Sequence, residues 1–560
     1  MYDRERRSGP GGPGSLSALA GDGSLRWGGT WRDDAWDRLR EPLDLLVIGG
    51  GITGAGLLLE AARLGLDAAL VEGRDFASGT SSRSAKLVHG GMRYLKEGRV
   101  ALTRRLLLER DRLLAERPGL VDPLDFVLPT YSGRKGDRLG YAAGVRLYDL
   151  LRGKRKTWRR HSRDEVAALI PGVLEEGLDG GYGYRDAVTD DARLVLRTLR
   201  EAAHDGAVVL NYVRAESLVR EGGRVRGAEL VDVASGRTVL ARAGVVVNAT
   251  GVWADRLRRD VGAAPRLRPV RGTHLIVPRE VLPLSHAVGL RHPVNGRYLY
   301  LLPWEGVTLV GTTDVDDAGG EGREPRATPA EVSYLLEGVG AWLPGVGLDA
   351  SRLLGAFAGV RPVVGAARGD PYRAGRDSVL WEEEGLLTVI SGKLTGFRAI
   401  VDRALARVVR ASGRPQRPAA PRHGAADEGS GALERLAEPV RRRLVGRYGA
   451  DAPFVAAAAR DGELEPVAHT PVLWAELRWA ARAEGVAHLD DLLLRRVRVG
   501  LLLPRGGEEI LSRVEALSRE ELGWDRERWS AEVERYRRAW SEAHDVPGKA
   551  SGAGTARTAP

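Results

Sequence analysis

The hydrophobic pattern near the start of the chain predicts a strand, a helix and a second strand in close succession. Residues 44–48 form an apolar run that ends in glycines and is too short for a helix, which favours a buried parallel strand. Residues 54–64 have the pattern of a helix, and residues 67–71 form another apolar strand that ends at Glu72. This βαβ opening predicts an α/β fold with a doubly wound sheet.

Further along, the pattern alternates between one long helix and groups of strands. Residues 99–116 place leucines at helical spacing between charges, with Pro118 just beyond, as in an amphipathic helix. Short strands follow between residues 208 and 247, where residues 225–233 form one arm of a hairpin after two glycines. A second strand-rich stretch covers residues 273–315. The middle of the chain therefore predicts more than one β-rich unit.

The two ends of the chain and one internal stretch lack these patterns. We expect residues 1–41 to form a flexible tail and residues 411–431, rich in Pro, Gly, Ala and Arg, to form a linker. Residues 432–544 are helical by periodicity, and residues 545–560 are expected to be disordered. No apolar run reaches the roughly 20 residues that cross a bilayer, and the start of the chain lacks the apolar core of a secretory signal. We therefore expect a cytoplasmic protein.

Composition excludes several classes of site. The chain has no cysteine, which rules out disulfides, thiolate catalysis, Cys-ligated zinc and iron–sulfur clusters. Its ten histidines are scattered without metal-ligand spacing, so we expect no protein metal site. The net charge of +10 favours an anionic partner, either nucleic acid, an acidic membrane or a phosphorylated substrate, beside the alternative of a generic arginine-rich surface. Because this charge is spread along the chain without a nucleic-acid-binding motif, we expect no nucleic-acid partner.

Residues 49–54, Gly-Gly-Gly-Ile-Thr-Gly, fit the pattern G-x-G-x-x-G between the first strand and the helix. Gly49 permits a tight turn, Gly51 lets backbone N–H groups approach a pyrophosphate, and Gly54 lets the helix pack against the strand. Glu72 closes the second strand 23 residues after Gly49, where its carboxylate can accept both hydroxyls of a ribose. The motif predicts a dinucleotide site but does not separate NAD from FAD.

Two later segments favour FAD. Residues 80–95 follow the second strand and are dense in hydroxyl residues, small residues and glycines, so they can run along the phosphates and ring of a flavin with little bulk. Residues 245–255 form a buried strand that ends in Ala-Thr-Gly, which allows another close approach of the backbone to the cofactor.

Together these pieces resemble the FAD-dependent glycerol-3-phosphate dehydrogenase family, within the D-amino-acid-oxidase-like flavoproteins. The similarity runs from about residue 42 to about residue 540 in the family's order, and the full set of motifs is highly specific. It is carried by residues 49–54, Glu72, Gly79-Thr-Ser-Ser82, Lys86-Leu-Val-His-Gly-Gly-Met-Arg-Tyr-Leu95, Asp190-Asp-Ala-Arg-Leu194, Asn248-Ala-Thr-Gly-Val-Trp253, Gly272-Thr-His-Leu-Ile-Val-Pro278, Gly311-Thr-Thr-Asp314, Gly359-Val-Arg-Pro362 and Gly392-Lys-Leu-Thr395.

The resemblance implies a Rossmann-like FAD-binding domain over residues 42–410, with an inserted β-rich substrate cap and the helical domain after it. The cap is expected mainly at about residues 121–180 and 261–350. The residues expected to contact FAD are Gly49, Gly51, Gly54, Glu72, Thr80, Ser81, Ser82, Lys86, His89, Gly90, Gly91, Ala249, Thr250, Gly251, Gly392, Leu394 and Thr395.

The resemblance also implies a substrate that carries a phosphate. A phosphate monoester is a dianion near neutral pH, so its site needs several fixed cations. The residues implied to bind it are Arg93, Tyr94, Arg361, Arg376 and Lys393.

Oxidation of a secondary alcohol also needs a group that removes the hydroxyl proton as hydride leaves. His274 is the candidate base because an imidazole titrates near neutral pH, with a structural histidine as the alternative. Arg361 or Lys393 could instead stabilise the developing alkoxide, so all three are candidate catalytic residues.

The implied reaction is oxidation of sn-glycerol 3-phosphate to dihydroxyacetone phosphate, with electrons passed through FAD to a membrane quinone. An oxidase that uses oxygen shares the same motifs, and an amine or amino-acid oxidase on the same scaffold is a more distant alternative. A non-catalytic flavin-binding or nucleic-acid-binding protein is the alternative from another class. The oligomeric state stays open, a homodimer included.

The basic residues 146–161, mixed with Leu, Tyr and Trp, suit an anionic membrane surface and a peripheral position on the inner face of the cell membrane. An exposed connecting loop is the alternative interpretation of this segment. Two departures from the family pattern leave the substrate contacts open: Gly396 precedes Phe397 where a hydroxyl residue is usual, and Arg376 is followed by Asp-Ser.

Overall fold

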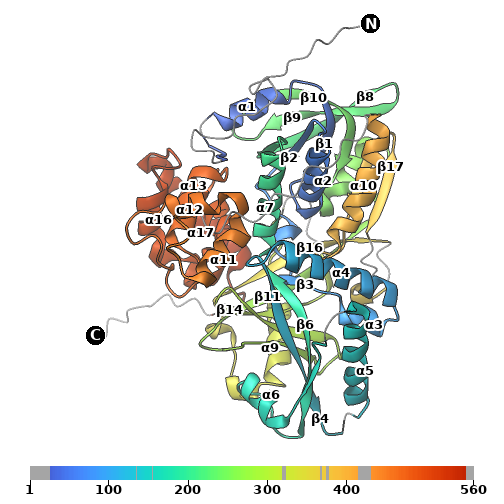
Figure 1. Cartoon of the computed structure of the whole chain (residues 1–560), viewed down its shortest axis with the longest axis vertical. Helices are drawn as coiled ribbons and strands as arrows, with labels where there is room; N and C mark the ends of the chain where they lie inside the picture. The colour runs from blue at the N-terminus through green and yellow to red at the C-terminus, as the bar shows by residue number, and fades with distance from the viewer. Residues whose placement is uncertain are drawn as a thin grey trace, which may run out of the picture.

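The computed structural model describes residues 25–28, 30–133, 135–153, 156–317, 323–365, 369–373, 378–413 and 431–549. Figure 1 shows three regions: a first sheet flanked by helices, a second sheet below it, and a helical region to one side formed by the C-terminal part of the chain. The predicted α/β fold class with a helical C-terminal domain is confirmed.

The first sheet forms around the predicted βαβ unit. Its strand order is β17-β18-β10-β1-β2-β7, and β1 (Leu43–Ile48) pairs in parallel with both β10 (Thr238–Asn248) and β2 (Ala68–Glu72). All six residues of β1 are buried, as expected for a central parallel strand covered on both faces. The other strands of this order are β7 (Val208–Asn211), β17 (Val379–Glu383) and β18 (Leu386–Ile390).

Helices and a hairpin complete this first region. Helix α2 (Ile52–Arg63) packs against α7 (Asp191–His204) and α10 (Phe397–Ser412). The predicted hairpin is confirmed, with β8 (Val213–Glu221) and β9 (Arg224–Asp232) extending from β10.

The second sheet is assembled from segments distant in sequence, in the order β15-β11-β14-β13-β12-β4-β6-β3, with β16 on β11 and β5 on β6. Strands β4, β5 and β12 to β15 fall within the residue ranges predicted for the cap, whereas β3 and β16 fall outside them. The cap boundaries stay a prediction. The strands are β3 (Leu87–Val88), β4 (Val121–Tyr131), β5 (Arg159–His161), β6 (Leu178–Thr189), β11 (Leu267–Pro278), β12 (Ala287–Arg291), β13 (Tyr298–Trp304), β14 (Val307–Gly311), β15 (Val315–Asp316) and β16 (Gly355–Val364).

Short and long helices cover this second sheet. Helix α4 (Val100–Glu116) confirms the predicted amphipathic helix and packs against α5 (Lys135–Arg152). The other helices of this region are α3 (Met92–Lys96), α6 (Arg163–Leu169) and α9 (Pro329–Gly340). The basic residues 146–161 are thus largely helix α5 and strand β5 in their described part, rather than one connecting loop.

The C-terminal helices attach to the first region through buried ion pairs. Arg193 on α7 pairs with Glu484, and Arg200 on the same helix pairs with Asp451, all with side chains at most 1% exposed. Removing one partner of such a buried pair is strongly destabilising because it leaves a charge without compensation. The helices are α11 (Glu438–Tyr448), α12 (Ala452–Ala457), α13 (Trp474–Ala483), α14 (Leu489–Asp491), α15 (Val499–Leu502), α16 (Leu511–Ser518) and α17 (Arg526–His544).

The expectation of a flexible tail over residues 1–41 is wrong for its described part. Helix α1 (Trp31–Arg38) is formed there, and Trp27, Trp31 and Trp36 are buried. The backbone N–H of Trp27 donates to the Ala483 carbonyl, which ties this segment to the C-terminal helices. The three tryptophans supply enough apolar surface to hold the segment, although its glycine content suggested otherwise. Residues 1–24, 414–430 and 550–560 lie outside the described residues.

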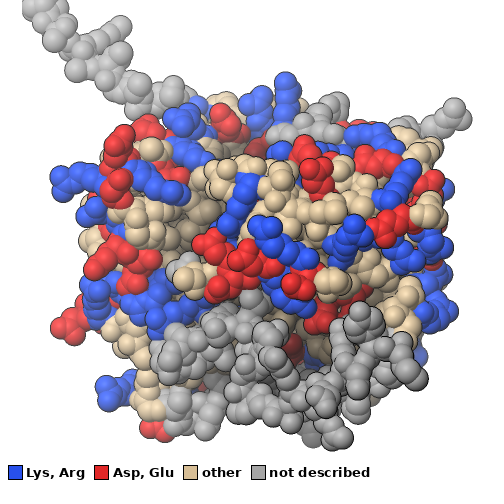
Figure 2. Space-filling view, turned by 90° about the horizontal axis from the view of Figure 1, so that it is seen from above, with Lys and Arg blue, Asp and Glu red and all other residues tan. Residues whose placement is uncertain are grey.

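The view onto the upper face shows basic and acidic side chains intermingled where residues are drawn in blue and red (Figure 2). Charged side chains at the surface of the chain also pair locally, as Arg237 does with Asp33 and Arg214 with Glu216. Mixed charges of this kind form a solvated surface rather than a continuous basic patch on this face.

His544, at the end of α17, makes the fold sensitive to acid. Burial, and after it the Arg83 guanidinium, lowers the pKa of His544 to about 3, so the folded protein keeps this imidazole neutral. The unfolded chain binds a proton there below about pH 6.5, so stability from this residue falls as pH drops from 6.5 towards 3. We expect the free energy of unfolding to be about 2 kcal/mol lower at pH 5 than at pH 7.5.

Urea unfolding of the wild type and of His544→Gln at both pH values measures this loss. The glutamine can still donate to the Ala356 carbonyl that faces His544. The difference in unfolding free energy between the two pH values should be about 2 kcal/mol smaller in His544→Gln than in the wild type. Equal differences in the two proteins would contradict the assignment.

Candidate active site

A cavity of about 720 Å³ runs between the two sheets. The first sheet contributes the glycine motif, the residues after β2 and the loop after β18, which all follow the carboxyl ends of its parallel strands, and the second sheet contributes β16. The predicted residues that line it are Gly49, Gly51, Glu72, Thr80, Ser81, His89, Gly91, Arg93, Tyr94, Ala249, Thr250, Gly251, Arg361, Gly392, Lys393, Leu394 and Thr395.

The glycine motif packs as its sequence predicts. Gly49 has a φ of +119°, and a Cβ on Gly49 would lie 2.6 Å from the Ala249 carbonyl oxygen. A Cβ on Gly54 would lie 2.0 Å from the Gly49 carbonyl oxygen, so helix α2 can approach β1 only without a side chain there. Gly54 supports the motif from behind, whereas Gly49 and Gly51 line the cavity.

Glu72 closes β2 beside this turn. Its carboxylate accepts hydrogen bonds from the backbone N–H of Gly50 at 2.7 Å and of Arg74 at 2.9 Å. Burial raises the pKa of Glu72, and these two backbone donors partly offset the effect. Each carboxylate oxygen retains a further lone pair, so Glu72 can also accept the ribose hydroxyls expected of an adenosine.

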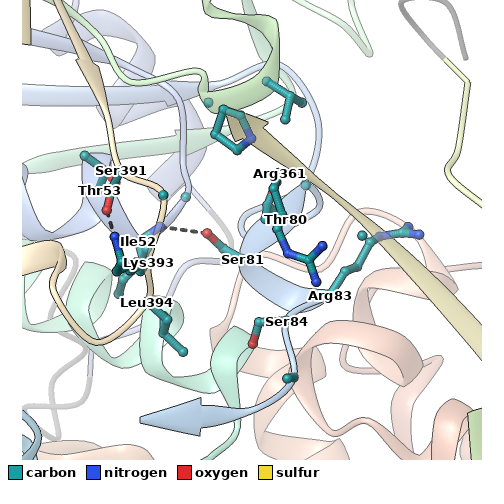
Figure 3. Close-up of a pocket in the computed structure, with 18 of the residues that line it drawn as sticks. Ile52, Thr53, Thr80, Ser81, Arg83, Ser84, Arg361, Ser391, Lys393 and Leu394 are labelled. Carbon is teal, nitrogen blue, oxygen red and sulfur yellow. Dashed lines mark hydrogen bonds between the residues drawn. The ribbon is translucent and has the colours of Figure 1, made fainter. Parts of the chain in front are cut away.

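The hydroxyl-rich segment curves around the start of α2. Ser81 lies on a 3₁₀ turn (Thr80–Ser82), and its Oγ accepts from the backbone N–H of Ile52 at 3.0 Å, as Figure 3 shows. Thr80 on the same turn donates to the carbonyl of Val360 in β16. The turn therefore links the phosphate-binding end of the cavity to the strand that carries Arg361.

The part of the cavity beside β16 is cationic. Arg361 on β16 donates to Asp314 at 2.7 Å and to Thr312 Oγ1 at 3.2 Å. Lys393 follows β18, and its Nζ lies 5.1 Å from the ring centre of Tyr94 on α3. Figure 3 shows Arg361 and Lys393 on different walls of the cavity.

Arg93, one residue before Tyr94, also reaches this part of the cavity. Its guanidinium lies 3.9 Å from the ring centre of Tyr372 and donates to the Tyr372 carbonyl. The structure thus brings together Arg93, Tyr94, Arg361 and Lys393, as expected for an anionic substrate. Arg376, the fifth predicted residue, lies outside the described residues.

Besides Gly54, three residues predicted to contact the cofactor lie behind the cavity wall instead. The Nζ of Lys86 is buried against Asp191 at 2.8 Å and the Ser82 carbonyl at 2.6 Å, so Lys86 faces the start of α7. Burial lowers the pKa of Lys86 to about 7, against the opposing charge of Asp191. Ser82 and Gly90 are likewise absent from the cavity lining.

The structure does not place His274 where a general base is needed. Its ring is 1% exposed, stacks on Phe357 at 4.9 Å and is absent from the cavity lining. On β11, Gly272 lies against the Arg361 guanidinium. His274 is two residues further along the strand, so it is on the same face of the sheet as Gly272. Burial, and after it the charge of Arg361, lowers the pKa of His274 well below its ordinary value. We correct the assignment accordingly: His274 is a neutral packing residue beneath the site.

Several lining residues were missed in the sequence. Asp186 on β6 accepts from Arg110 at 2.7 Å, from Tyr148 at 2.9 Å and from the backbone N–H of Gly90 at 3.3 Å, which fixes the His-Gly-Gly turn. The period-two pattern of β6 and β13 could have suggested which of their residues face inwards. The missed residues include Arg83, Tyr184, Asp186, Trp253, Tyr298, Tyr300, Thr312, Asp314 and Tyr372.

The residues present fit an FAD molecule. Gly49, Gly51 and Gly251 line the cavity without side chains, and the N-terminus of α2 points backbone N–H groups towards it. Glu72 can take the ribose, while the loop after β18 forms a further wall of the cavity. Among the described residues, no cluster of His, Asp or Glu is arranged to hold a metal ion.

The family of this chain follows from comparison with known proteins. Residues 44–395 match the family described as FAD dependent oxidoreductase, and residues 397–529 match the C-terminal domain of alpha-glycerophosphate oxidase. Glycerol-3-phosphate dehydrogenase 2 of Mycobacterium tuberculosis is 36% identical over 548 residues, which cover 92% of each chain. The chain belongs to the FAD-dependent glycerol-3-phosphate dehydrogenase and oxidase family.

Other members of this family agree in sequence and in fold. The aerobic glycerol-3-phosphate dehydrogenase of Staphylococcus epidermidis is 33% identical, with coverage of 83% of this chain and 88% of its own. The glycerol-3-phosphate dehydrogenase from Bacillus halodurans, solved in complex with FAD, superposes with a TM-score of 0.72 at 29% identity, covering 91% of this chain and 97% of its own. FAD is therefore the cofactor of this family member.

Proposed function

We propose that this enzyme oxidises sn-glycerol 3-phosphate at C2 to dihydroxyacetone phosphate. The observation that carries the proposal is the convergence of Arg93, Arg361 and Lys393 in a cavity that also carries the FAD-binding motif. A phosphate dianion needs several fixed cations, whereas an amine substrate would be repelled by them. The family membership supports the same substrate.

In the proposed mechanism, the cations bind and orient the substrate. The Arg361 fork, held by Asp314 and Thr312, offers paired N–H donors to the phosphate oxygens. Lys393 and Arg361 also favour the alkoxide that develops at the C2 oxygen as its proton passes to water in the cavity. FAD, when bound, supplies the acceptor for the hydride from C2.

Anaerobic mixing of the purified holoenzyme with sn-glycerol 3-phosphate tests this function. We expect the visible absorbance of the oxidised flavin to bleach with this compound but not with glycerol or sarcosine, because neither carries the phosphate. A flavin that stays oxidised with sn-glycerol 3-phosphate would contradict the assignment of the substrate.

We further propose that electrons pass from the flavin to a membrane quinone, with the enzyme bound peripherally at the inner face of the cell membrane. Exposed leucines on helices α4 and α5 support this location: Leu108, Leu139, Leu147 and Leu150, which are 46, 72, 39 and 75% exposed. Exposed arginines lie beside them on the same helices, namely Arg104, Arg105, Arg112 and Arg146. Such a surface suits an anionic bilayer.

This leucine surface is also close to the active site. Leu106, on the inner side of α4, lines the cavity, and α3 with Arg93 and Tyr94 contacts both α4 and α5. In the described part of the chain, no helix is long and apolar enough to cross a bilayer.

The double variant Leu139→Asp/Leu150→Asp should lose most of its binding to anionic vesicles. Each inserted leucine contributes about 1.5 kcal/mol or more, so we expect binding to fall about 100-fold or more in a co-sedimentation assay. Val294→Asp is the matched control, because Val294 is 69% exposed but lies outside α4 and α5. Equal losses in both proteins would argue against a membrane surface at these helices.

The acceptor itself is tested separately. With sn-glycerol 3-phosphate as donor, steady-state turnover should be faster with a quinone analogue than with oxygen alone. Faster turnover with oxygen, with peroxide as product, would assign the chain to the oxidases of this family instead.

A further inference from the structure

The loop that follows β2, residues 73–82, carries much of the cofactor site. Its cavity-lining residues are Gly73, Arg74, Ala77, Ser78, Gly79, Thr80 and Ser81. Within its own domain the loop makes several hydrogen bonds. The Ala77 N–H donates to the Gly50 carbonyl at 3.0 Å, and Ser81 accepts from Ile52. Asp75 accepts from the Asn211 side chain at 3.0 Å, and the Arg74 carbonyl accepts from the Tyr212 N–H at 2.9 Å. These contacts are single hydrogen bonds, each of which contributes about 1 kcal/mol.

The start of this loop is held much more firmly by the C-terminal domain. Arg496 makes a bidentate ion pair with Asp75, with N–O distances of 2.6 and 2.8 Å, and both side chains are fully buried. The Nε of Arg495 donates to the same Asp75 carboxylate. Two arginines from the C-terminal domain thus meet one carboxylate of the cofactor loop.

The end of the loop is also held by the C-terminal domain. Arg498 donates from Nη2 to the Ser82 carbonyl at 2.9 Å, and its side chain is 1% exposed. Arg498 has a φ of +67°, and it follows the turn of helix that carries Arg495 and Arg496. A single four-residue segment, Arg495–Arg498, therefore contacts both ends of the cofactor loop.

The charges at this contact compensate one another, and only Arg535 among them is substantially exposed. Arg495 also binds Asp490 and Asp491, and Arg535 binds Asp490. Three carboxylates, including Asp75, therefore face three guanidinium groups. Because each charge depends on its neighbours for compensation, the loop cannot move away from Arg495–Arg498 without leaving buried charges unpaired.

We propose that the C-terminal domain of this chain positions the cofactor loop for FAD binding, with Arg495, Arg496 and Arg498 as positioning residues and Asp75 and the Ser82 carbonyl as their targets. The domain then acts on the flavin through residues 73–82, without touching the flavin or the substrate. Loss of the contact releases both ends of the loop, and its cavity-lining residues no longer stay in the geometry that FAD needs.

The test compares FAD release from holoenzyme variants. In Asp75→Asn and Arg496→Met we expect the dissociation constant for FAD, followed by flavin fluorescence on dilution, to rise roughly 5- to 150-fold, the usual range of coupling between sites. Arg496→Lys keeps the charge but loses the fork, so its effect should be intermediate. The reduction potential of the flavin that stays bound should also shift, and the shift should be smaller in Arg496→Lys than in Asp75→Asn and Arg496→Met.

Arg200→Met is the matched control. It removes another buried pair between the FAD domain and the C-terminal domain, with Asp451, but Arg200 contacts neither Asp75 nor Ser82. We expect a lower melting temperature with an FAD dissociation constant within about threefold of the wild type. The proposal would be overturned if the FAD dissociation constant rose equally in Arg200→Met and Arg496→Lys. It would also be overturned if this constant did not rise in Asp75→Asn and Arg496→Lys. Since FAD release needs no substrate, this outcome is independent of the proposed reaction.

Discussion

Replacement of Arg361 by alanine is expected to lower kcat/KM for sn-glycerol 3-phosphate by about 10²- to 10³-fold. The substitution removes a rigid pair of donors from the cationic part of the cavity, where Asp314 and Thr312 now fix the guanidinium. Lys393 and Arg93 remain, but neither offers the same fork at that position. Flavin reduction in single-turnover mixing measures the loss directly.

Two further variants separate binding of the phosphate from general damage. Arg361→Lys keeps the charge without the fork and should recover part of the rate. Arg326→Ala is the control, because Arg326 is exposed and lies outside the cavity lining. If Arg361→Ala retained more than about a tenth of the wild-type kcat/KM while Arg326→Ala behaved as wild type, Arg361 would not bind the phosphate.

Gly54→Ala should produce a protein that retains almost no flavin. The added Cβ would lie 2.0 Å from the Gly49 carbonyl oxygen and 3.2 Å from Val47 Cγ1. A backbone oxygen cannot move aside as a side chain can, so helix α2 must shift away from β1 and carry its N–H groups away from the cofactor. Such overpacking costs about 3 kcal/mol, which corresponds to a weakening of FAD binding of roughly 100-fold.

The ratio of flavin to protein after purification, together with urea unfolding, measures this effect. Gly140→Ala offers a matched control in another helix, because a Cβ at Gly140 has no neighbour within 4 Å. Alanine there should change the free energy of unfolding by no more than about 1 kcal/mol, in the stabilising direction. A fully flavinated Gly54→Ala protein would show that the motif does not set the cofactor geometry.

The sequence alone determined the local elements that bind the dinucleotide. The apolar run before Gly49, the glycine spacing and Glu72 each act within a few residues, so strand, turn and helix follow from them directly. The same holds for α4, whose leucines repeat at helical spacing. The family resemblance then named Arg93, Arg361 and Lys393, which share one cavity although they lie far apart in the chain.

The tertiary structure decided what each of these motif residues faces. Lys86 and His274 stand in specific motifs, yet one faces Asp191 and the other packs on Phe357, because strand alternation and register set the direction of a side chain. Trp27 and Trp31 are buried in a segment that is hydrogen-bonded to the C-terminal helices. The contact of Arg495–Arg498 with the cofactor loop joins residues more than 400 positions apart. No local pattern encodes such a pairing, since it depends on how complete domains pack together.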